Sequence, residues 1–251
     1  MLRKTEVLAV AAVVLALALA AGLAAIPAAA AVPLPQAVAL RAPAPVAIDG
    51  NLADWLFAKA NAIVLDTAEQ LTPGYENPAT WHGPSDLSAI AYVAYDDDNL
   101  YIAFDVRDDA VIQQFSGTSI YNGDGPELYL DTDPGAGASA YTPSAWQFGF
   151  TPGTDAKAPS WVLYEQVSGR VLDPSAVKVA AHRTAEGYIF EAAISLAALA
   201  FHPSAGQKAG FDLAVNDVDS FEATATENQI ILSGSGDGWQ TPAVFVTLLF
   251  Q

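Results

Sequence analysis

The sequence predicts an all-β protein, a single antiparallel β-sandwich of about ten strands with one or two short helical turns. Short apolar segments recur along the chain with the alternation typical of strands, and Gly, Pro, Asn and Asp separate them. Helical signals are confined to residues 52–60, where apolar side chains have helical spacing, and 195–200, which Ser195 can cap. There is no repeat of fixed period and no strong internal linker, so we expect one domain.

The strands follow one another at regular intervals. A short strand over 45–51 ends in an Asp-Gly turn, and a hairpin over 87–106 turns at the Asp-Asp-Asp-Asn run. Leu100, Ile102 and Phe104 alternate with smaller or polar residues in the second arm of this hairpin. The remaining predicted strands cover residues 127–131, 146–150, 161–167, 177–182, 188–194, 210–219, 228–232 and 243–250.

The N-terminus carries a predicted secretory signal over residues 1–31. Arg3 and Lys4 precede an apolar run over 7–26, and small residues near Ala30 and Ala31 suit a signal peptidase. A Pro- and Ala-rich linker is predicted over 32–45, and the sandwich over 46–251. We therefore expect a secreted or cell-surface protein. The apolar run is also long enough to span a bilayer, so contact with a membrane is expected only if the run remains as an uncleaved anchor.

The charge of the chain limits its partners. A net charge of −18 repels nucleic acid, while a hydrophobic content of 52% excludes disorder. The absence of Cys excludes disulfides, so the core must hold the protein together, with help from metal ions. Acidic residues at loop ends predict one or more structural calcium ions, since Ca²⁺ prefers oxygen ligands. The candidate ligands are Asp108, Asp109, Asp131, Asp133, Asp217 and Asp219.

The stretch 121–131 is the candidate centre of the site. Its Gly-rich turn leads into a strand in which Leu128 and Leu130 point one way, while Glu127, Tyr129 and Asp131 point the other. A face with two carboxylates and a phenol suits a polyhydroxylated ligand or a hard cation. The alternative is a half-exposed strand whose acidic side chains are simply solvated.

The order of six segments resembles the family-nine carbohydrate-binding modules, which are sugar-binding sandwiches appended to xylanases and related exported proteins. The similarity extends over about 46–249, and its segments are 48–55, 95–104, 123–131, 187–194, 210–217 and Trp239. The resemblance implies a non-catalytic module that binds carbohydrate, either sugar ends or a polysaccharide such as xylan or cellulose, and it also favours calcium.

The resemblance further implies a site in which two aromatic rings clamp a terminal sugar. The corresponding rings are Tyr121 and Trp239, and the strand glutamate of the family falls on Glu127; Tyr129 and Gln147 are expected to line the floor. Two positions depart from the family: Gly149 stands where sugar-binding members carry arginine, and Ala214 where they carry glutamine. Losing two buried polar contacts costs about 1–3 kcal/mol each, so we expect weak binding or a different ligand.

Three alternatives remain open. One is a structural or adhesive sandwich that has lost its ligand. Another is a haem-binding sandwich domain of a redox enzyme, although the only Met is Met1 and His182 and His202 are scattered. The third is an enzyme, in which Glu127 and Asp131 form an inverting pair of carboxylates.

Overall fold

The structure, a computed structural model, describes residues 36–72, 80–136, 139–154 and 156–251, all within the compact unit Leu34–Gln251. The predicted signal over 1–31 and the first residues of the predicted linker lie outside the described residues. In the described ranges no helix is long and apolar enough to cross a membrane.

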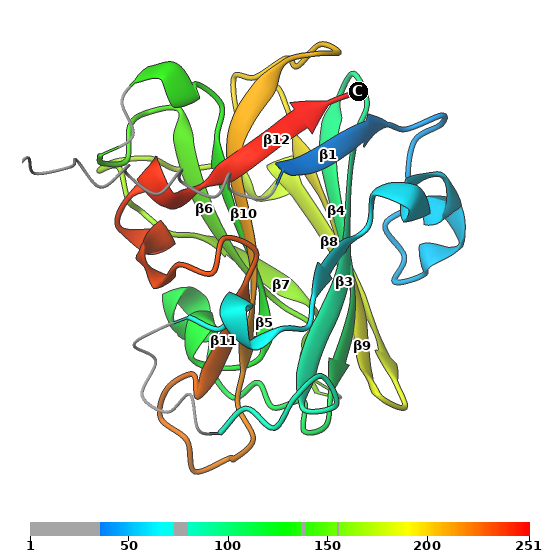
Figure 1. Cartoon of the computed structure of the whole chain (residues 1–251), viewed down its shortest axis with the longest axis vertical. Helices are drawn as coiled ribbons and strands as arrows, with labels where there is room; N and C mark the ends of the chain where they lie inside the picture. The colour runs from blue at the N-terminus through cyan, green and yellow to red at the C-terminus, as the bar shows by residue number, and fades with distance from the viewer. Residues whose placement is uncertain (1–35, 73–79, 137–138, 155) are drawn as a thin grey trace, which may run out of the picture. The chain divides into compact units, whose positions relative to one another are not determined.

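The described residues form a mostly β fold (Figure 1). The strands are β1 Gln36–Arg41, β2 Ile63–Leu65, β3 Leu87–Tyr95, β4 Asn99–Asp108, β5 Gly125–Asp131, β6 Ala145–Thr151, β7 Ser160–Leu163, β8 Val177–Thr184, β9 Gly187–Ser195, β10 Lys208–Asp217, β11 Asn228–Ile231 and β12 Val246–Phe250. The 3₁₀ helices are η1 Leu52–Asn61, η2 Ala68–Gln70, η3 Gly117–Asn122, η4 Pro134–Ala136, η5 Pro174–Ala176, η6 Gly236–Trp239 and η7 Pro242–Val244.

Ten of these strands follow one path, β7-β6-β5-β10-β12-β1-β3-β4-β9-β8, with β11 added beside β10 and β2 beside β3. The prediction of a purely antiparallel sandwich is wrong at one strand, because β1 pairs in parallel with both β12 and β3. The result is a twelve-stranded mixed sheet. Strand β1 lies in the stretch predicted as linker, where Ala37 and Ala39 are buried. Small alanines between prolines give no strand-like alternation of large apolar residues, which is why the sequence pattern misses it.

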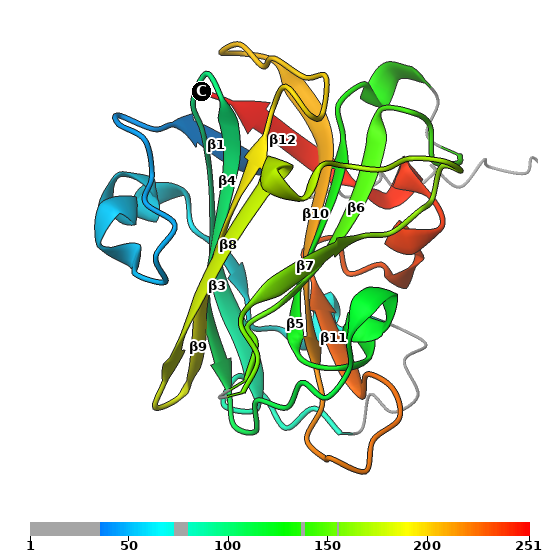
Figure 2. The same cartoon turned by 180° about the vertical axis from the view of Figure 1, so that it is seen from behind.

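The path folds back so that two groups of strands face each other across the core (Figures 1 and 2). Strands β5, β6 and β10 lie on one side and β3, β4 and β9 on the other, while β12 and β1 connect them. The rings of Phe150 on β6 and Phe190 on β9 lie 5.2 Å apart between the groups. Leu128 and Leu130 of β5 belong to the same buried cluster, as their alternation predicts.

The helical content is small, as expected, but it is distributed differently. The predicted helix over 52–60 corresponds to η1, whereas in the stretch 195–200 Ser195 ends β9 and residues 196–200 form turns and not a helix. The predicted strand over 45–51 is a loop. Its backbone N–H groups at Asp49, Gly50 and Asn51 donate to Oε2 of Glu191, and Trp55 Nε1 donates to Oε1. A buried carboxylate therefore satisfies this loop in place of a neighbouring strand.

Strand β5 is central on its side of the fold. It pairs antiparallel with β6 on one edge and with β10 on the other. While Leu128 and Leu130 enter the core, Glu127 and Tyr129 occupy the opposite face of the strand, and both are buried there as well. The alternative of a half-exposed strand is thus wrong for this face, which loops cover, and the candidate site lies between these loops and the sheet.

Candidate functional site

A pocket of about 370 Å³ lies on this face of β5 and β6. All five predicted ligand-binding residues line it, although they are spread over more than one hundred residues of sequence. Two further lining residues were not predicted, and both follow β7. The complete lining is Tyr121, Glu127, Tyr129, Gln147, Tyr164, Gln166 and Trp239.

The floor of the pocket is organised by Glu127, which is only 2% exposed. Its Oε2 accepts hydrogen bonds from Tyr129 Oη at 2.8 Å and from Gln147 Nε2 at 2.9 Å, and its Oε1 accepts from Asn216 Nδ2 at 2.7 Å. Burial raises the pKa of Glu127, and these three donors oppose the shift. Because all three partners donate, they favour the ionised carboxylate.

A second layer of hydrogen bonds fixes the side chains that hold Glu127. Gln166 Nε2 donates to Oε1 of Gln147 at 2.6 Å, which sets the orientation of that amide. On the other side, Gln229 Nε2 donates to Oδ1 of Asn216 at 2.7 Å, and Thr72 Oγ1 donates to Oε1 of Gln229 at 2.8 Å. The floor is therefore a preorganised polar network.

Two aromatic side chains that line the pocket are partly exposed to solvent. Tyr121, on η3, is 42% exposed, and Trp239, on η6, is 51% exposed. Thr226 Oγ1 donates to the carbonyl of Tyr121, and Tyr141 Oη donates to the carbonyl of Gly238 at 2.8 Å. These bonds tie the two loops that carry the rings to other parts of the fold. Exposed rings on tethered loops provide flat apolar surfaces at little cost in conformational entropy.

The two departures from the family pattern flank Glu127 on the neighbouring strands. Gly149 of β6 and Ala214 of β10 are the Cα partners of Glu127 in the two ladders. Neither residue brings a polar side chain to the carboxylate. Asn216, two residues after Ala214, supplies the amide contact instead.

The second carboxylate on the face of β5 does not line the pocket. Asp131 accepts hydrogen bonds from Ser144 Oγ at 2.7 Å and from the backbone N–H of Asp133 at 3.1 Å. The pocket thus holds one carboxylate, Glu127, and not a pair. Asp131 and Asp133, two of the predicted calcium ligands, lie outside the acidic cluster described next.

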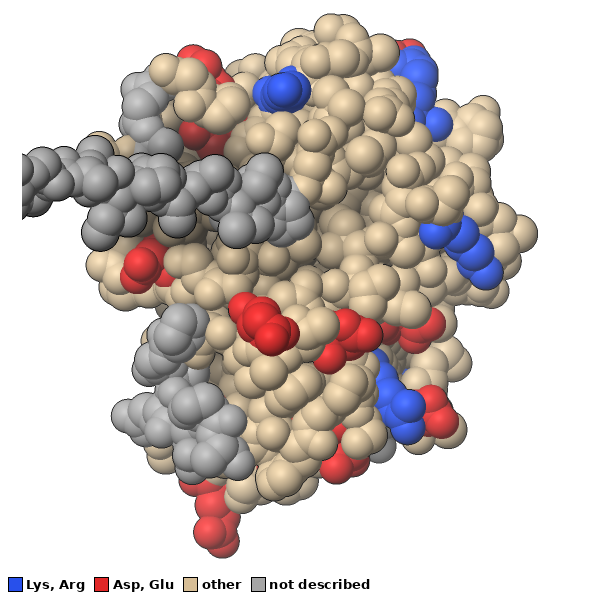
Figure 3. Space-filling model, viewed as in Figure 1, with Lys and Arg blue, Asp and Glu red and all other residues tan. Residues whose placement is uncertain are grey.

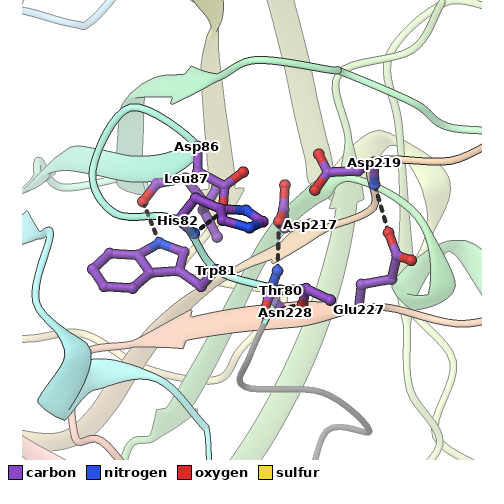
Figure 4. A network of polar contacts seen from close by, with 9 residues as sticks. All are labelled: Thr80, Trp81, His82, Asp86, Leu87, Asp217, Asp219, Glu227 and Asn228. Carbon is purple, nitrogen blue, oxygen red and sulfur yellow. Dashed lines mark hydrogen bonds and ion pairs between the residues drawn. The ribbon is translucent and has the colours of Figure 1, made fainter.

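That cluster lies where β4, β5 and β10 begin or end. Two groups of three carboxylates, each with oxygen atoms within 4.8 Å of one another, share Asp217; Figure 4 shows one of them, with its three side chains directed toward a common point. One group is Asp86, Asp217 and Asp219, and the other is Asp108, Asp124 and Asp217. Asp108, Asp217 and Asp219 were predicted ligands. Asp109 lies beside Asp219, with which it interacts electrostatically.

In the described part of the chain, the basic groups near the cluster are Arg183, which acts electrostatically on Asp108, and His82, whose Nδ1 lies 3.9 Å from Oδ2 of Asp86. Among the residues that the structure describes, no Lys or Arg forms an ion pair with a carboxylate of the cluster. Basic side chains are also sparse on the surface, as the face in Figure 3 shows. Burial raises the pKa of Asp108 to about 7, of Asp217 to about 8 and of Asp219 to about 6, and neighbouring carboxylates add to each shift. The pKa of Asp124 is raised as well, chiefly by burial.

Some oxygen atoms of the cluster have no hydrogen-bond partner. Asp108 Oδ2 and Asp217 Oδ1 are buried and unpartnered, as is Tyr188 Oη, whose pKa is raised by burial and by these acids. Asp124 differs, because its two oxygens accept from the backbone N–H groups of Ile112 and Val218. An unpartnered buried carboxylate oxygen is costly, and a set of hard oxygen donors suits a cation such as Ca²⁺. The residues present therefore fit calcium.

Sequence reasoning missed Tyr164, Gln166, Asp86 and Asp124 for different reasons. Asp124 lies in the Gly-Asp-Gly turn that was treated as a turn alone, and Asp86 stands directly before β3. An acidic residue beside a strand was a usable signal in both cases. Tyr164 and Gln166 carry no such signal, because only the pairing of β7 with β6 brings them over Gln147 and Gly149.

Comparisons with known proteins agree with this architecture. The family model described as "Carbohydrate family 9 binding domain-like" matches residues 48–251. No curated protein matches the chain. A carbohydrate-binding module of family 9 from Caldicellulosiruptor kristjanssonii, solved with glucose, is 20% identical over 86% of this chain and 96% of that one, with a TM-score of 0.64. The corresponding values for its complex with cellotriose are 20%, 86%, 94% and 0.62. A putative carbohydrate-binding protein from Bacteroides uniformis is 12% identical, with a TM-score of 0.52, over 86% of this chain and 99% of that one.

Proposed function

The chain belongs to the carbohydrate family 9 binding domain-like family, and we propose that it is an exported, non-catalytic module that binds a sugar ring between Tyr121 and Trp239. The observation that carries the proposal is the pocket itself. Two half-exposed aromatic rings open onto the same cavity as a buried carboxylate held by three donors.

The chemistry of the pocket matches a pyranose. A pyranose presents C–H groups on its faces, which pack on aromatic rings, and hydroxyls around its rim, which need hydrogen-bond partners. A carboxylate has about four acceptor positions, and three positions of Glu127 are filled by protein donors. One position on Oε1 therefore remains to accept a hydrogen bond from a sugar hydroxyl.

The proposed ligand is the end of a glucose-containing saccharide. Glucose and cellotriose are the sugars present in the similar structures from Caldicellulosiruptor kristjanssonii, which guides the choice of ligands to test. Because Gly149 and Ala214 contribute no polar contacts, we expect a dissociation constant of about 1 mM, equivalent to roughly 4 kcal/mol of binding free energy. A non-catalytic role is supported by the position of Asp131, which leaves Glu127 without a second carboxylate in the pocket.

We also propose that calcium occupies the cluster of Asp86, Asp108, Asp124, Asp217 and Asp219. The buried, unpartnered oxygens of Asp108 and Asp217 support this assignment. A bound cation supplies positive charge directly between these carboxylates and keeps them ionised. Asp124 lies three residues before Glu127, and Asp217 directly follows Asn216, so the ion also stabilises the loops around the pocket.

The test is calorimetric titration of the protein with glucose, cellotriose and xylose, combined with a glycan array. We expect binding by the wild type, none by Trp239→Ala, and unchanged binding by Phe221→Ala, a control in which an aromatic side chain that is 74% exposed is lost outside the pocket. Absence of binding to every sugar, with the protein folded, favours a structural or adhesive sandwich. Full retention of binding by Trp239→Ala places the ligand elsewhere.

A further inference from the structure

Gly149 has a specific reason to lack a side chain. A Cβ placed on it comes 2.8 Å from the ring atoms Cε2 and Cζ of Tyr164, and closer still to the Tyr164 hydroxyl. Real Cβ atoms do not approach other atoms this closely. Gly149 is also the ladder partner of Glu127. The phenol of Tyr164 therefore lies directly over the sheet, beside the carboxylate at the centre of the pocket.

Tyr164 also contacts the aromatic side chain proposed to stack on the sugar. The ring centroids of Tyr121 and Tyr164 are 6.1 Å apart, with an interplanar angle of 71°. This edge-to-face arrangement is favourable and restricts the orientation of the exposed Tyr121 ring. A sugar lying flat on Tyr121 consequently has the ring of Tyr164 at its rim. The backbone of Tyr164 is fixed as well, because its N–H donates to the carbonyl of Gln147 at 3.0 Å.

The charge of the pocket is negative and uncompensated. Among the seven lining residues, Glu127 is the only acid, and its three donors favour the ionised form; none of the seven is Lys or Arg. Like charges about 6 Å apart in partly buried surroundings repel strongly enough to weaken binding on the order of 100-fold. An acidic sugar gains no ion pair here and meets this repulsion.

From these contacts the geometry points to Tyr164 as a specificity-determining residue: a third aromatic wall, seated over Gly149, that acts together with the carboxylate of Glu127 to limit the pocket to uncharged pyranoses. This inference rests on the proposed function. The wall orients Tyr121, covers the rim of the sugar with an apolar surface, and occupies the space in which a side chain at position 149 would supply polar or charged contacts.

The test follows the indole N–H signal of Trp239 by NMR during titration with glucose and with glucuronate, which differ by one carboxylate. We expect glucuronate to bind at least tenfold more weakly than glucose. Tyr164→Ala and Tyr164→Leu should each weaken glucose binding about tenfold, since a ring contact is lost, while Tyr164→Phe, which keeps the ring, should weaken it less than Tyr164→Leu does. Melting temperatures confirm that each variant is folded, and Leu preserves apolar volume if Ala does not fold.

The pairing of Gly149 with Tyr164 is tested by a double-mutant cycle. Gly149→Ala should weaken glucose binding about as much as Tyr164→Ala, and the double variant should bind no more weakly than Tyr164→Ala alone. Gly135→Ala is the matched control, because a Cβ there meets one atom, at 3.7 Å. Wild-type affinity in Tyr164→Ala, multiplicative losses in the double variant, or equal affinity for glucuronate overturns the inference. If Trp239→Ala still abolishes binding, only this inference fails; if the wild type binds no sugar, the proposed function fails with it.

Discussion

Removing calcium should make the stability of this protein depend on pH in a direction set by the acidic cluster. The perturbation is exhaustive treatment with EDTA, followed by thermal unfolding between pH 5 and pH 8. Asp108 and Asp217 are the informative residues, because burial raises their pKa values from 3.8 to about 7 and about 8. In the metal-free protein these groups hold protons across a range in which the unfolded chain has released them.

The direction in which stability changes with pH follows from proton linkage. Where the folded state binds more protons than the unfolded state, the free energy of unfolding falls as the pH rises. For Asp108, whose pKa moves from 3.8 to about 7, the loss that falls between pH 5 and pH 8 is on the order of 3 kcal/mol. The loss for the coupled cluster is of similar or greater size. At about 2–4 °C per kcal/mol for a domain of this size, the melting temperature falls by roughly 10 °C.

Calcium should remove most of this dependence, because a bound cation stabilises the ionised carboxylates. We therefore expect the stabilisation by calcium, measured as the difference in melting temperature with and without the ion, to grow steadily from pH 5 to pH 8. Scanning calorimetry in matched low-calcium and calcium-containing buffers measures it. A melting temperature that is unaffected by EDTA at pH 8, or one that rises with pH in the metal-free protein, refutes the reasoning.

Three substitutions test other parts of the account. Asp217→Asn removes one of the crowded charges, so it should raise the melting temperature in EDTA and lower it in calcium. The control Asp98→Asn, at an exposed position, should change neither melting temperature. Loss of stability in both buffers would argue for an ordinary packing defect. Glu127→Gln should weaken glucose binding about tenfold or more, since a charge-assisted hydrogen bond is worth about 1.5–3 kcal/mol. It should also lower the melting temperature, because its amide presents N–H groups to the three donors that hold Glu127. Unchanged affinity would remove Glu127 from the site. Glu191→Gln should destabilise the protein by about 2–4 kcal/mol in urea unfolding, because an amide presents N–H groups to donors from the 49–51 loop or from Trp55; wild-type stability would show that this carboxylate is dispensable.

The alternation of apolar residues was sufficient to predict most of the fold. The hairpin of β3 and β4 lies where Leu100, Ile102 and Phe104 alternate, and the orientation of Leu128 and Leu130 is confirmed. Strand β1 was missed because its pairing is decided by distant strands and not by its own composition. Local patterns record which face of a strand is buried, but they do not record which strand comes beside it.

The candidate site was likewise predicted only in part. Tyr121, Glu127 and Trp239 were assigned through the family resemblance, and in the structure all three line one pocket. Tyr164 was not found, since its importance depends on lying over Gly149, a contact made through strand pairing. In the acidic cluster, Asp108, Asp217 and Asp219 were predicted but Asp86 and Asp124 were not, for a related reason. Acidic residues are usually exposed, and only the folded chain shows that Asp124 is buried beside Asp108 and Asp217.

A crystal structure of the protein soaked with glucose or cellotriose tests the central claim most directly. We predict one sugar ring in the pocket, with Tyr121 and Trp239 against the faces of the sugar and Tyr164 at the rim of the sugar. One sugar hydroxyl should donate to Oε1 of Glu127. A sugar bound at another surface, with this pocket filled only by water, would contradict it.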